Sequence, residues 1–502
     1  MKEKYFTITV FLSIVSFVFI VYYPALHFGM AGLDLNLFVK AGNGNLSEVW
    51  AYFTGFLHSV EFRPLNHYLF FLASRKLFGY NSQALHAVVL LINCCNAFLL
   101  YLLVSRITGS RKTALLSLLV FLTRIAVIRS YYILNYSPPK LCFFTLLTFI
   151  LYLKSKERKA VFSPLYVFTY LLAMLTRETF VLLPVGILFY ELVFNRGKKI
   201  TLAEVKKRLA GLYPFFAVIF GYLLIRVPFF IGKVSMKKQG VSISFRSLSV
   251  NHFFGNLMNL IRFNFNFLTR SIASVRLSNM GLNLVDVNIY IAVLVSGHII
   301  YSQVLRRPMR LSGRLRNNMI WGSAWFLLYV SLYCFFSTLS PEYLYLSLVG
   351  SSLAVASWIE YYYDLFYSEK ALLFRGISFL LAVHFLAGFY FLVRTRTKDD
   401  GLLKWWPVAD KYMADIRKSR PEISPGGRVH YYIRGNVSRH VLGNEHQLNQ
   451  KGEGYLFKYI YENDKLEVIG HDYPVDPAGV RTGDLVFRLE PSRLIDETSG
   501  YR

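Results

Sequence analysis

Long apolar stretches separated by short basic loops are the feature that most constrains how this chain can fold. A bilayer core about 30 Å thick is crossed by about 20 mostly apolar helical residues. Eleven stretches approach or meet this requirement: 5–26, 83–105, 113–131, 141–153, 160–176, 179–194, 209–230, 286–304, 318–338, 343–359 and 371–393. The fold class predicted is therefore a mainly α, polytopic transmembrane helical bundle with about 11 spans. Residues 252–268 are expected to form one more span or a helix lying in the membrane interface.

The composition excludes several classes of soluble protein. The chain is 54% hydrophobic and 17% charged, whereas soluble chains carry about 25% charged residues. The formal net charge of +27 would suggest a nucleic-acid partner in a soluble protein. Here the basic residues lie between the apolar runs, so we expect no nucleic-acid partner. The four cysteines also lie inside apolar runs, which excludes a secreted disulfide framework.

The distribution of Lys and Arg predicts the orientation in the membrane. With the N-terminus in the cytoplasm, the inner loops at 106–112, 154–159, 196–208 and 306–316 are dense in basic residues, as positive-inside sorting requires. The opposite loops, including the long first one at 27–82, carry fewer basic residues for their length. An odd number of spans places the C-terminus outside the cytoplasm. We expect a multi-pass protein that resides in a bacterial plasma membrane or in the endoplasmic reticulum.

The C-terminal segment differs in composition from the rest. Residues 394–502 contain turn-forming residues between short alternating runs at Val429–Ile433, Tyr455–Tyr461, Leu466–Ile469 and Leu485–Leu489. This pattern predicts strands. We therefore expect two domains, a membrane domain at 1–393 that includes the first outer loop and a small β-rich extracytoplasmic domain at 394–502.

Ionisable residues near hydrocarbon are costly and therefore mark candidate sites. The predicted orientation brings several of them to the outer side. They are Asp34, Arg63, His67, Lys140, Arg177 and Glu178, and Glu342 near Tyr343 and Tyr345. The chain has no phosphate-binding loop, no dinucleotide fingerprint and no metal-ligand cluster, so we expect no cofactor and no metal ion, although a site with one carboxylate does not exclude a divalent metal.

Each candidate also has a plainer interpretation. Asp34 either acts as a base at the membrane surface or caps a helix that begins at Leu35. Arg63 precedes a proline and an apolar stretch that predicts an interfacial helix; it either binds a lipid phosphate or extends toward the headgroups. Asn93 and Asn96 are expected to form hydrogen bonds between helices. Arg177 and Glu178 lie between two short predicted spans. They either form an ion pair with each other or face an anionic lipid headgroup.

Four motifs, taken in order, resemble the GT-C class of polytopic glycosyltransferases, in particular proteins related to dolichyl-phosphate-mannose protein O-mannosyltransferases. These motifs are Gly32-Leu33-Asp34-Leu35, then Phe62-Arg63-Pro64-Leu65 with Leu77-Phe78-Gly79-Tyr80-Asn81 and residues 86–101, then Leu175-Thr176-Arg177-Glu178-Thr179 with Tyr190-Glu191-Leu192, and finally residues 342–350. The chain departs from the family pattern at three places. Leu33 stands where a second acid is common, Arg177 replaces Lys, and Glu342 replaces Arg.

The resemblance implies a polyprenyl-phosphate sugar as donor and a glycan, lipid or protein as acceptor at the outer membrane face. It implies that Asp34 is the catalytic base and that Arg63, Arg177 and Lys140 bind the donor phosphate. Supporting roles fall to Glu178, His67, Tyr136, Glu342, Tyr343 and Tyr345. The number of spans also allows a transporter or flippase of lipid-linked sugars, and Leu33 and Glu342 allow a catalytically inactive assembly factor.

Overall fold

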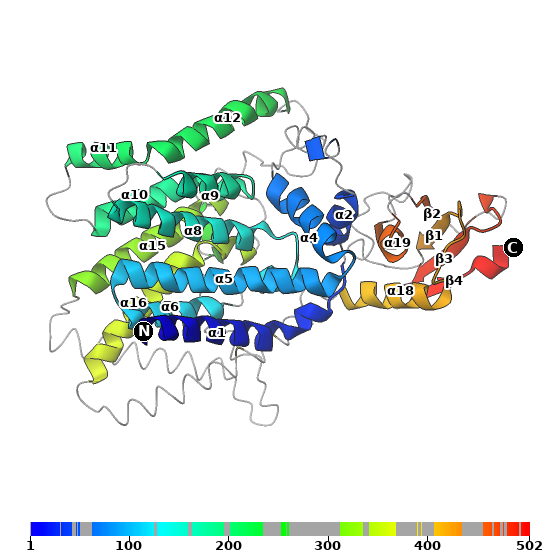
Figure 1. Cartoon of the computed structure of the whole chain (residues 1–502), viewed down its shortest axis with the longest axis horizontal. Helices are drawn as coiled ribbons and strands as arrows, with labels where there is room; N and C mark the ends of the chain where they lie inside the picture. The colour runs from blue at the N-terminus through cyan, green and yellow to red at the C-terminus, as the bar shows by residue number, and fades with distance from the viewer. Residues whose placement is uncertain are drawn as a thin grey trace. The chain divides into compact units, whose positions relative to one another are not determined.

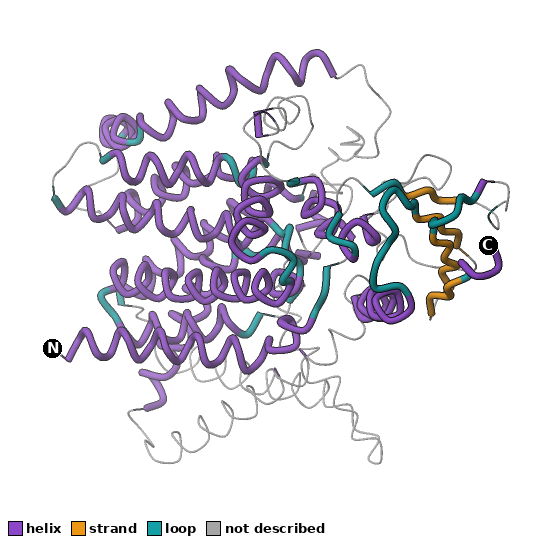
Figure 2. Tube along the Cα trace, turned by 45° about the vertical axis from the view of Figure 1, so that its right-hand side comes forward, coloured by secondary structure: helices purple, strands orange, loops and turns teal. Residues whose placement is uncertain are grey.

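The structure is a computed structural model of the whole chain, and it is mainly helical (Figures 1 and 2). It describes residues 2–30, 32–42, 47, 49–50, 63–124, 128–158, 163–194, 201–233, 253–257, 259–260, 312–334, 341–367, 389, 393, 406–433, 455–463, 466–471, 475, 479–490 and 493–501. The chain divides into two compact units. The first, the helical unit, comprises residues 1–21, 92–130 and 137–395, and the second, the mixed unit, comprises 22–91, 131–136 and 396–502.

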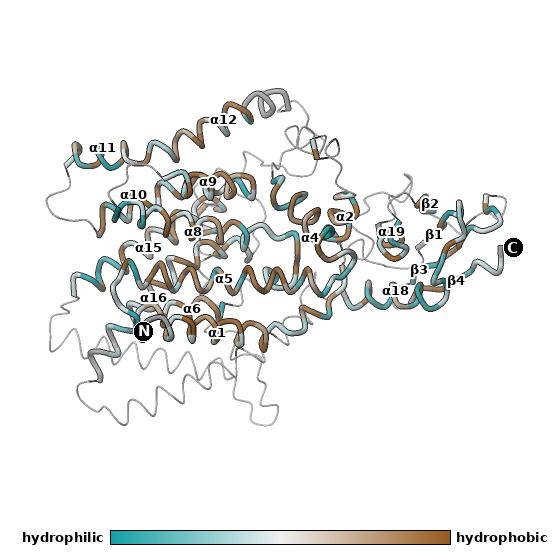
Figure 3. Tube along the Cα trace, in the orientation of Figure 1, coloured by the Kyte–Doolittle hydropathy of each residue, from teal (hydrophilic) through white to brown (hydrophobic). Residues whose placement is uncertain are grey.

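The helical unit consists mostly of apolar helices, and three of them, α1, α5 and α7, continue into the mixed unit. The helices are α1 (Lys2–Tyr22), α5 (Ser82–Thr108), α6 (Arg111–Leu122), α7 (Arg129–Tyr132), α8 (Ser137–Glu157), α9 (Pro164–Met174), η4 (Glu178–Leu182), α10 (Leu183–Phe194), α11 (Leu202–Gly211), α12 (Tyr213–Lys233), α15 (Gly313–Tyr333), η6 (Pro341–Leu344) and α16 (Leu348–Tyr367). Figure 3 shows hydrophobic residues along most of α1 and α5, whereas α11 carries several hydrophilic positions.

Side-chain caps fix where several of these helices begin. The Ser110 side chain accepts a hydrogen bond from the Thr113 N–H at the start of α6, and the Ser312 side chain accepts one from the Leu315 N–H at the start of α15. Such caps satisfy N–H groups that have no partner within the helix. Further along, α15 and α16 approach closely at Gly322 and Gly350, where a Cβ atom on either residue would overlap the carbonyl oxygen of the other. Small residues of this kind allow membrane helices to pack backbone against backbone.

Two of the described helices are long and apolar enough to cross a membrane. They are Tyr5–His27 and Ser82–Thr108, and a third span results if Leu202–Gly211 and Tyr213–Arg226, which are bent by 65° at a break, are counted together. The chain is thus a membrane protein with apolar helices, whereas the number of about 11 spans stays a prediction. The predicted span at 286–304 lies outside the described residues, and so does almost all of the span at 371–393. Most of 252–268 also lies outside them, although residues 253–257 are helical.

One predicted span is interrupted. The apolar run at 113–131 begins as α6, but this helix ends at Leu122 and the next described helix, α7, starts at Arg129. At the break, the Thr123 hydroxyl donates to the carbonyl of Leu119 at 2.8 Å. A Thr side chain bound back to the preceding turn competes with the regular helix. The continuous helix predicted from hydropathy over 113–131 is therefore wrong.

The mixed unit combines short helices with a small sheet. Its helices are η1 (Tyr23–His27), α2 (Gly32–Lys40), η2 (Leu65–Leu69), α4 (Phe70–Phe78), α18 (Trp406–Ser419), α19 (Tyr455–Ile460) and η9 (Thr498–Tyr501). Its strands are β1 (Val429–Ile433), β2 (Val468–His471), β3 (Leu485–Glu490) and β4 (Arg493–Asp496). Pro64 begins the helical stretch of η2 and α4, as the sequence predicted, and Gly79 ends it with a φ of 58°. Proline is favoured at the first helical turn, and glycine adopts positive φ without strain.

The sheet has the strand order β2-β1-β3-β4, with β1 parallel to both β2 and β3 and with β3 antiparallel to β4. Three predicted strands are confirmed, each within two residues. The predicted strand at Tyr455–Tyr461 is wrong, because these residues form the helix α19. A short apolar run does not distinguish a strand from a buried helix by its periodicity. The predicted domain boundary between residues 393 and 394 stays a prediction.

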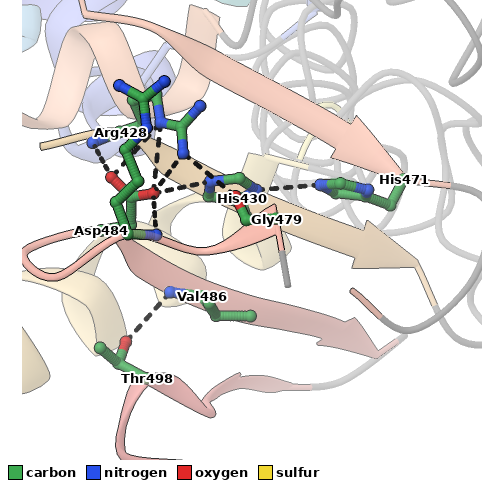
Figure 4. A network of polar contacts seen from close by, with 8 residues as sticks. Arg428, His430, His471, Gly479, Asp484, Val486 and Thr498 are labelled. Carbon is green, nitrogen blue, oxygen red and sulfur yellow. Dashed lines mark hydrogen bonds and ion pairs between the residues drawn. The ribbon is translucent and has the colours of Figure 1, made fainter. Parts of the chain in front are cut away.

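A buried polar network holds the centre of the sheet (Figure 4). The carboxylate of Asp484, just before β3, accepts hydrogen bonds from the Arg428 side chain at 2.7 Å and from the backbone N–H groups of Arg428 and Arg481, both at 2.9 Å. It also lies 3.1 Å from His430 Nε2, and His430 Nδ1 lies 3.0 Å from His471 Nε2. Burial alone would raise the pKa of Asp484, but these donors outweigh it and hold the pKa well below its usual range.

Candidate functional site

The carboxylate of Asp34 is buried and is held by a segment a hundred residues further along the chain. Asp34 Oδ2 accepts a hydrogen bond from the Leu134 N–H at 2.9 Å, and Oδ1 accepts from the Asn135 N–H at 2.8 Å and from Asn135 Nδ2 at 2.5 Å. The side chain is fully buried, at 0% exposure. Two backbone N–H groups and one side-chain amide thus donate to the carboxylate. Asp34 is therefore fixed in position as a buried acceptor.

Helix α2 shows that Asp34 does not cap its own helix. The helix begins at Gly32, so Asp34 lies within its first turn, and its carboxylate binds residues 134 and 135 instead. The alternative in which Asp34 caps a helix starting at Leu35 is therefore wrong.

Asn135 connects Asp34 with the helix that follows Arg63. Besides donating to Asp34, Asn135 accepts a hydrogen bond on its carbonyl oxygen from Asn66 Nδ2 at 2.6 Å. Asn66 and His67 are buried on η2, and Arg63 is half-buried just before it. Tyr136 follows Asn135 and is also half-buried. The mixed unit thus brings Asp34, Asn66 and Asn135 together, with His67 next to Asn66 in sequence.

Arg177 lies in the helical unit at the turn between α9 and η4, where its backbone is extended. Its Nη1 donates to Ser137 Oγ at 3.0 Å, and its guanidinium carbon lies 5.7 Å from the ring centre of Tyr333 and 5.4 Å from that of Tyr343. The two rings are stacked, 4.5 Å apart. A guanidinium at this distance from aromatic faces is held by cation–π attraction. Arg177 is 7% exposed, so a buried positive charge faces the start of α8.

The surroundings of Arg177 suit an anion. Ser137 is the first residue of α8, and Lys140, which is also buried, lies in the first turn of the same helix. The N-terminus of a helix favours negative charge. Within the part of the chain that the structure describes, Arg177 forms no ion pair with a carboxylate, Glu178 included. The supporting role of Glu178 therefore stays a prediction.

Tyr345 contacts two asparagines of α5, whereas its neighbour Tyr343 packs against Arg177. Its hydroxyl donates to Asn93 Oδ1 at 2.5 Å and accepts from Asn96 Nδ2 at 3.2 Å. Asn93 also donates to the carbonyl of Ser130 at 3.1 Å, and Asn96 donates to that of Pro139 at 2.8 Å. The expectation that Asn93 and Asn96 join helices is confirmed. The side chain of Glu342 lies outside the described residues, although its backbone forms part of η6.

Asn66, Asn135 and Ser137 were not among the predicted site residues. The one signal in the sequence is that Asn135-Tyr136-Ser137-Pro138-Pro139-Lys140 is a polar, proline-containing break between two apolar runs on the predicted outer side. Among the described residues, no group of three or more His, Cys, Asp or Glu side chains is arranged to hold a metal ion.

Residues 62–225 match the family model of the dolichyl-phosphate-mannose-protein mannosyltransferases. The predicted resemblance is confirmed. The matched segment includes Arg63, His67, Asn135, Lys140 and Arg177, whereas Asp34 and residues 342–345 lie outside it. This mannosyltransferase-like segment thus contains the buried arginine and the helix start that it contacts.

A solved structure is also similar to the chain. It is the crystal structure of ArnT from Cupriavidus metallidurans bound to undecaprenyl phosphate, with 14% sequence identity, 95% of this chain and 92% of that chain covered, and a TM-score of 0.49. No curated protein matches the chain at a significant level.

Proposed function

We propose that this protein is a glycosyltransferase that moves a sugar from a polyprenyl-phosphate donor to a lipid-linked, polysaccharide or protein acceptor at the outer face of the membrane, with inversion at the anomeric carbon. The observation that carries the proposal is the match of residues 62–225 to a family whose donor is a polyprenyl-phosphate sugar. The buried charge of Arg177 inside that segment, which has no carboxylate partner among the described residues, supports it.

We assign binding of the donor phosphate to Arg177 and Lys140, with Arg63 as a further contact. Negative charge grows on the phosphate as the bond to the sugar breaks, and fixed positive groups stabilise that charge. The guanidinium offers two parallel N–H groups to phosphate oxygens. Tyr333 and Tyr343 hold it without neutralising it, so its charge is retained for the ligand.

The base is assigned to Asp34. The acceptor hydroxyl transfers its proton to the carboxylate, its oxygen forms the new bond to the anomeric carbon, and the bond from that carbon to the phosphate oxygen breaks with its electron pair leaving on the polyprenyl phosphate. To take the proton, the carboxylate shares or exchanges one of the hydrogen bonds from Leu134 and Asn135.

The residues that hold the two proposed groups are close together in the sequence. Asn135 binds Asp34, and Ser137 binds Arg177. Only Tyr136 separates Asn135 from Ser137 in the sequence.

Replacement of the proposed base tests the function. Asp34→Asn should lower sugar transfer from a labelled polyprenyl-phosphate sugar by about 100-fold or more, because a positioned general base contributes roughly that factor. Asp415→Asn is the matched control, since Asp415 lies on α18 and takes no part in the proposed site. Both variants should reach the membrane in wild-type amounts.

The outcome separates the classes of function. Transfer by the wild-type protein that is lost in Asp34→Asn supports the proposal. Full activity of Asp34→Asn removes Asp34 as the base. Movement of the labelled lipid across a vesicle membrane without transfer would show a flippase, and neither transfer nor movement would indicate an assembly factor.

A further inference from the structure

The C-terminal segment contacts the chain on both sides of Asp34, within the mixed unit. Helix α18 reaches Gly29, five residues before Asp34, and helix α19 reaches Phe38, four residues after it. Phe38 lies on α2, the helix that carries Asp34.

The contact before Asp34 is made by Asp410. The Gly29 N–H donates to Asp410 Oδ2 at 3.3 Å, and the Gly29 carbonyl oxygen lies 3.3 Å from Nε2 of the buried His86 on α5. Both backbone polar groups of Gly29 are thus bound by side chains. A Cβ atom at this position would overlap the carboxylate of Asp410, so glycine permits this close approach.

The contact after Asp34 is an aromatic cluster formed by Phe38, Tyr80 and Tyr459. The ring centre of Phe38 lies 5.4 Å from that of Tyr80 and 5.7 Å from that of Tyr459, both edge-on. The Tyr459 hydroxyl donates to the carbonyl of Tyr80 at 2.9 Å, and the guanidinium of Arg75 lies 4.9 Å from the Tyr80 ring. Such aromatic pairs contribute specific geometry as well as buried area.

Asp410 is a costly residue for its position. Burial raises the pKa of Asp410 to about 6, although the hydrogen bond from Gly29 acts in the opposite direction. Burial of a carboxylate is unfavourable unless it is hydrogen-bonded. The hydrogen bond from the Gly29 N–H partly compensates for this burial.

We propose that α18 and α19 position the helix of Asp34, with Asp410 and Tyr459 as the positioning residues. This inference deepens the proposed function and rests on the assignment of Asp34 as the base. It gives the C-terminal segment, which lies outside the family match, a role in the reaction without contact with the substrate. Asp410 fixes where α2 begins, and Tyr459 fixes how its far end packs.

Hydrogen exchange on the full-length protein in lipid nanodiscs tests the positioning directly. Asp410→Leu and Tyr459→Ala should each speed amide exchange in residues 28–40 by about fivefold or more, since a lost hydrogen bond costs about 1 kcal/mol. Asp410→Asn should restore the wild-type rate, because its amide oxygen still accepts from Gly29. Asp415→Leu, on the same helix, and Tyr461→Ala, whose hydroxyl binds Arg420 within the C-terminal segment, are the matched controls.

Enzymatic measurement adds a readout that a purely structural role would not change. In Asp410→Leu and Tyr459→Ala, kcat for sugar transfer should fall while the KM for the donor stays within about twofold, because Asp34 and not the phosphate site is displaced. Unchanged exchange at residues 28–40 in both variants would overturn the inference. If the wild-type protein transfers no sugar, the proposed function fails, whereas the exchange rates still decide whether the C-terminal segment holds α2.

Discussion

The arginine at position 177 shows how one residue difference from the family pattern fits its surroundings. The motif that this segment resembles carries Lys here, and this chain carries Arg. The planar guanidinium lies near two stacked tyrosine rings while Nη1 binds Ser137. An ammonium group is compact and strongly hydrated and does not stack in this way. Arg177 and the Tyr333–Tyr343 pair therefore pack together as one cation–π cluster.

Variants at Arg177 should distinguish the effect of its positive charge on donor binding from the effect of the planar guanidinium shape. Arg177→Ala should raise the KM for the polyprenyl-phosphate donor by about tenfold or more, because it removes a charge-assisted contact with phosphate. Arg177→Lys should retain the positive charge but lose the bidentate contact with the phosphate, and it should therefore give an intermediate KM. The measurement is steady-state transfer at varied donor concentration. Wild-type KM values in both variants would place the phosphate elsewhere.

At the predicted site, the sequence pointed to buried ionisable residues where hydrocarbon makes charge costly, and their roles in a site stay predictions. That rule selected Asp34, Arg177 and Lys140, which are all buried. It did not select Asn66, Asn135 or Ser137, because uncharged polar residues are common at helix ends and the hydrogen bond between Asn135 and Asp34 joins positions 101 residues apart. Nothing local in the sequence indicates such a partner.

At the scale of elements, the strands of the C-terminal sheet were easier to predict than its helices. Short runs between turn-forming residues revealed β1 and β3, although burial does not alternate along them: residues 429–432 of β1 and 485–487 of β3 are all buried. The same pattern misassigned α19, where Leu456, Phe457 and Ile460 are buried. Spacing of three and four residues is helical, but a run of six residues is too short for that spacing to stand out. Phe457 packs between Tyr431 and Phe487, so tertiary contacts select the helix.

The polar network at Asp484 should dominate the stability of the sheet. Asp484→Asn should weaken hydrogen-exchange protection in β1 and β3 by roughly 3 kcal/mol, because it leaves Arg428 without its buried partner. Asp496→Asn is the control; it breaks the more exposed ion pair with Arg420, and such pairs contribute less than about 1 kcal/mol.

The pKa shift gives the sign of the pH dependence for this network. The pKa of Asp484 is lower in the folded protein than its ordinary value of 3.8. Its contribution to stability is therefore present above that ordinary value and is lost as the pH falls below it. Wild-type protection should approach that of Asp484→Asn in acid. Equal protection of the two proteins at neutral pH would contradict the assignment.

At the scale of the whole molecule, hydropathy predicted the class of protein but not the arrangement of its helices. The apolar runs correctly indicated a mainly helical membrane protein. They failed at residues 113–131, where one apolar run contains a helix, a break and a further helix start. Hydropathy averages over a window, whereas a break depends on single residues such as Thr123. Sequence also did not group residues 22–91 with 396–502, because that association depends on contacts distant in the chain.

Topology mapping should place the predicted outer segments on one side of the membrane. Reporter fusions or cysteine labelling at positions near Asp34, Arg177 and Trp406 should all report the extracytoplasmic side, and positions near Lys156 should report the cytoplasm, as the distribution of Lys and Arg requires. A result that places Asp34 and Arg177 on opposite sides would end the proposed function.

The hydrogen bond from Asn135 to Asp34 has a practical consequence for production of the protein. Asn135-Tyr136-Ser137 is an acceptor triplet for N-glycosylation, and Nδ2, the atom that would carry the glycan, is the atom that binds Asp34. An oligosaccharide attached there during synthesis would occupy the place of the carboxylate. Expression in a secretory host that modifies such triplets should therefore yield misassembled material, and a host without this modification is the better source.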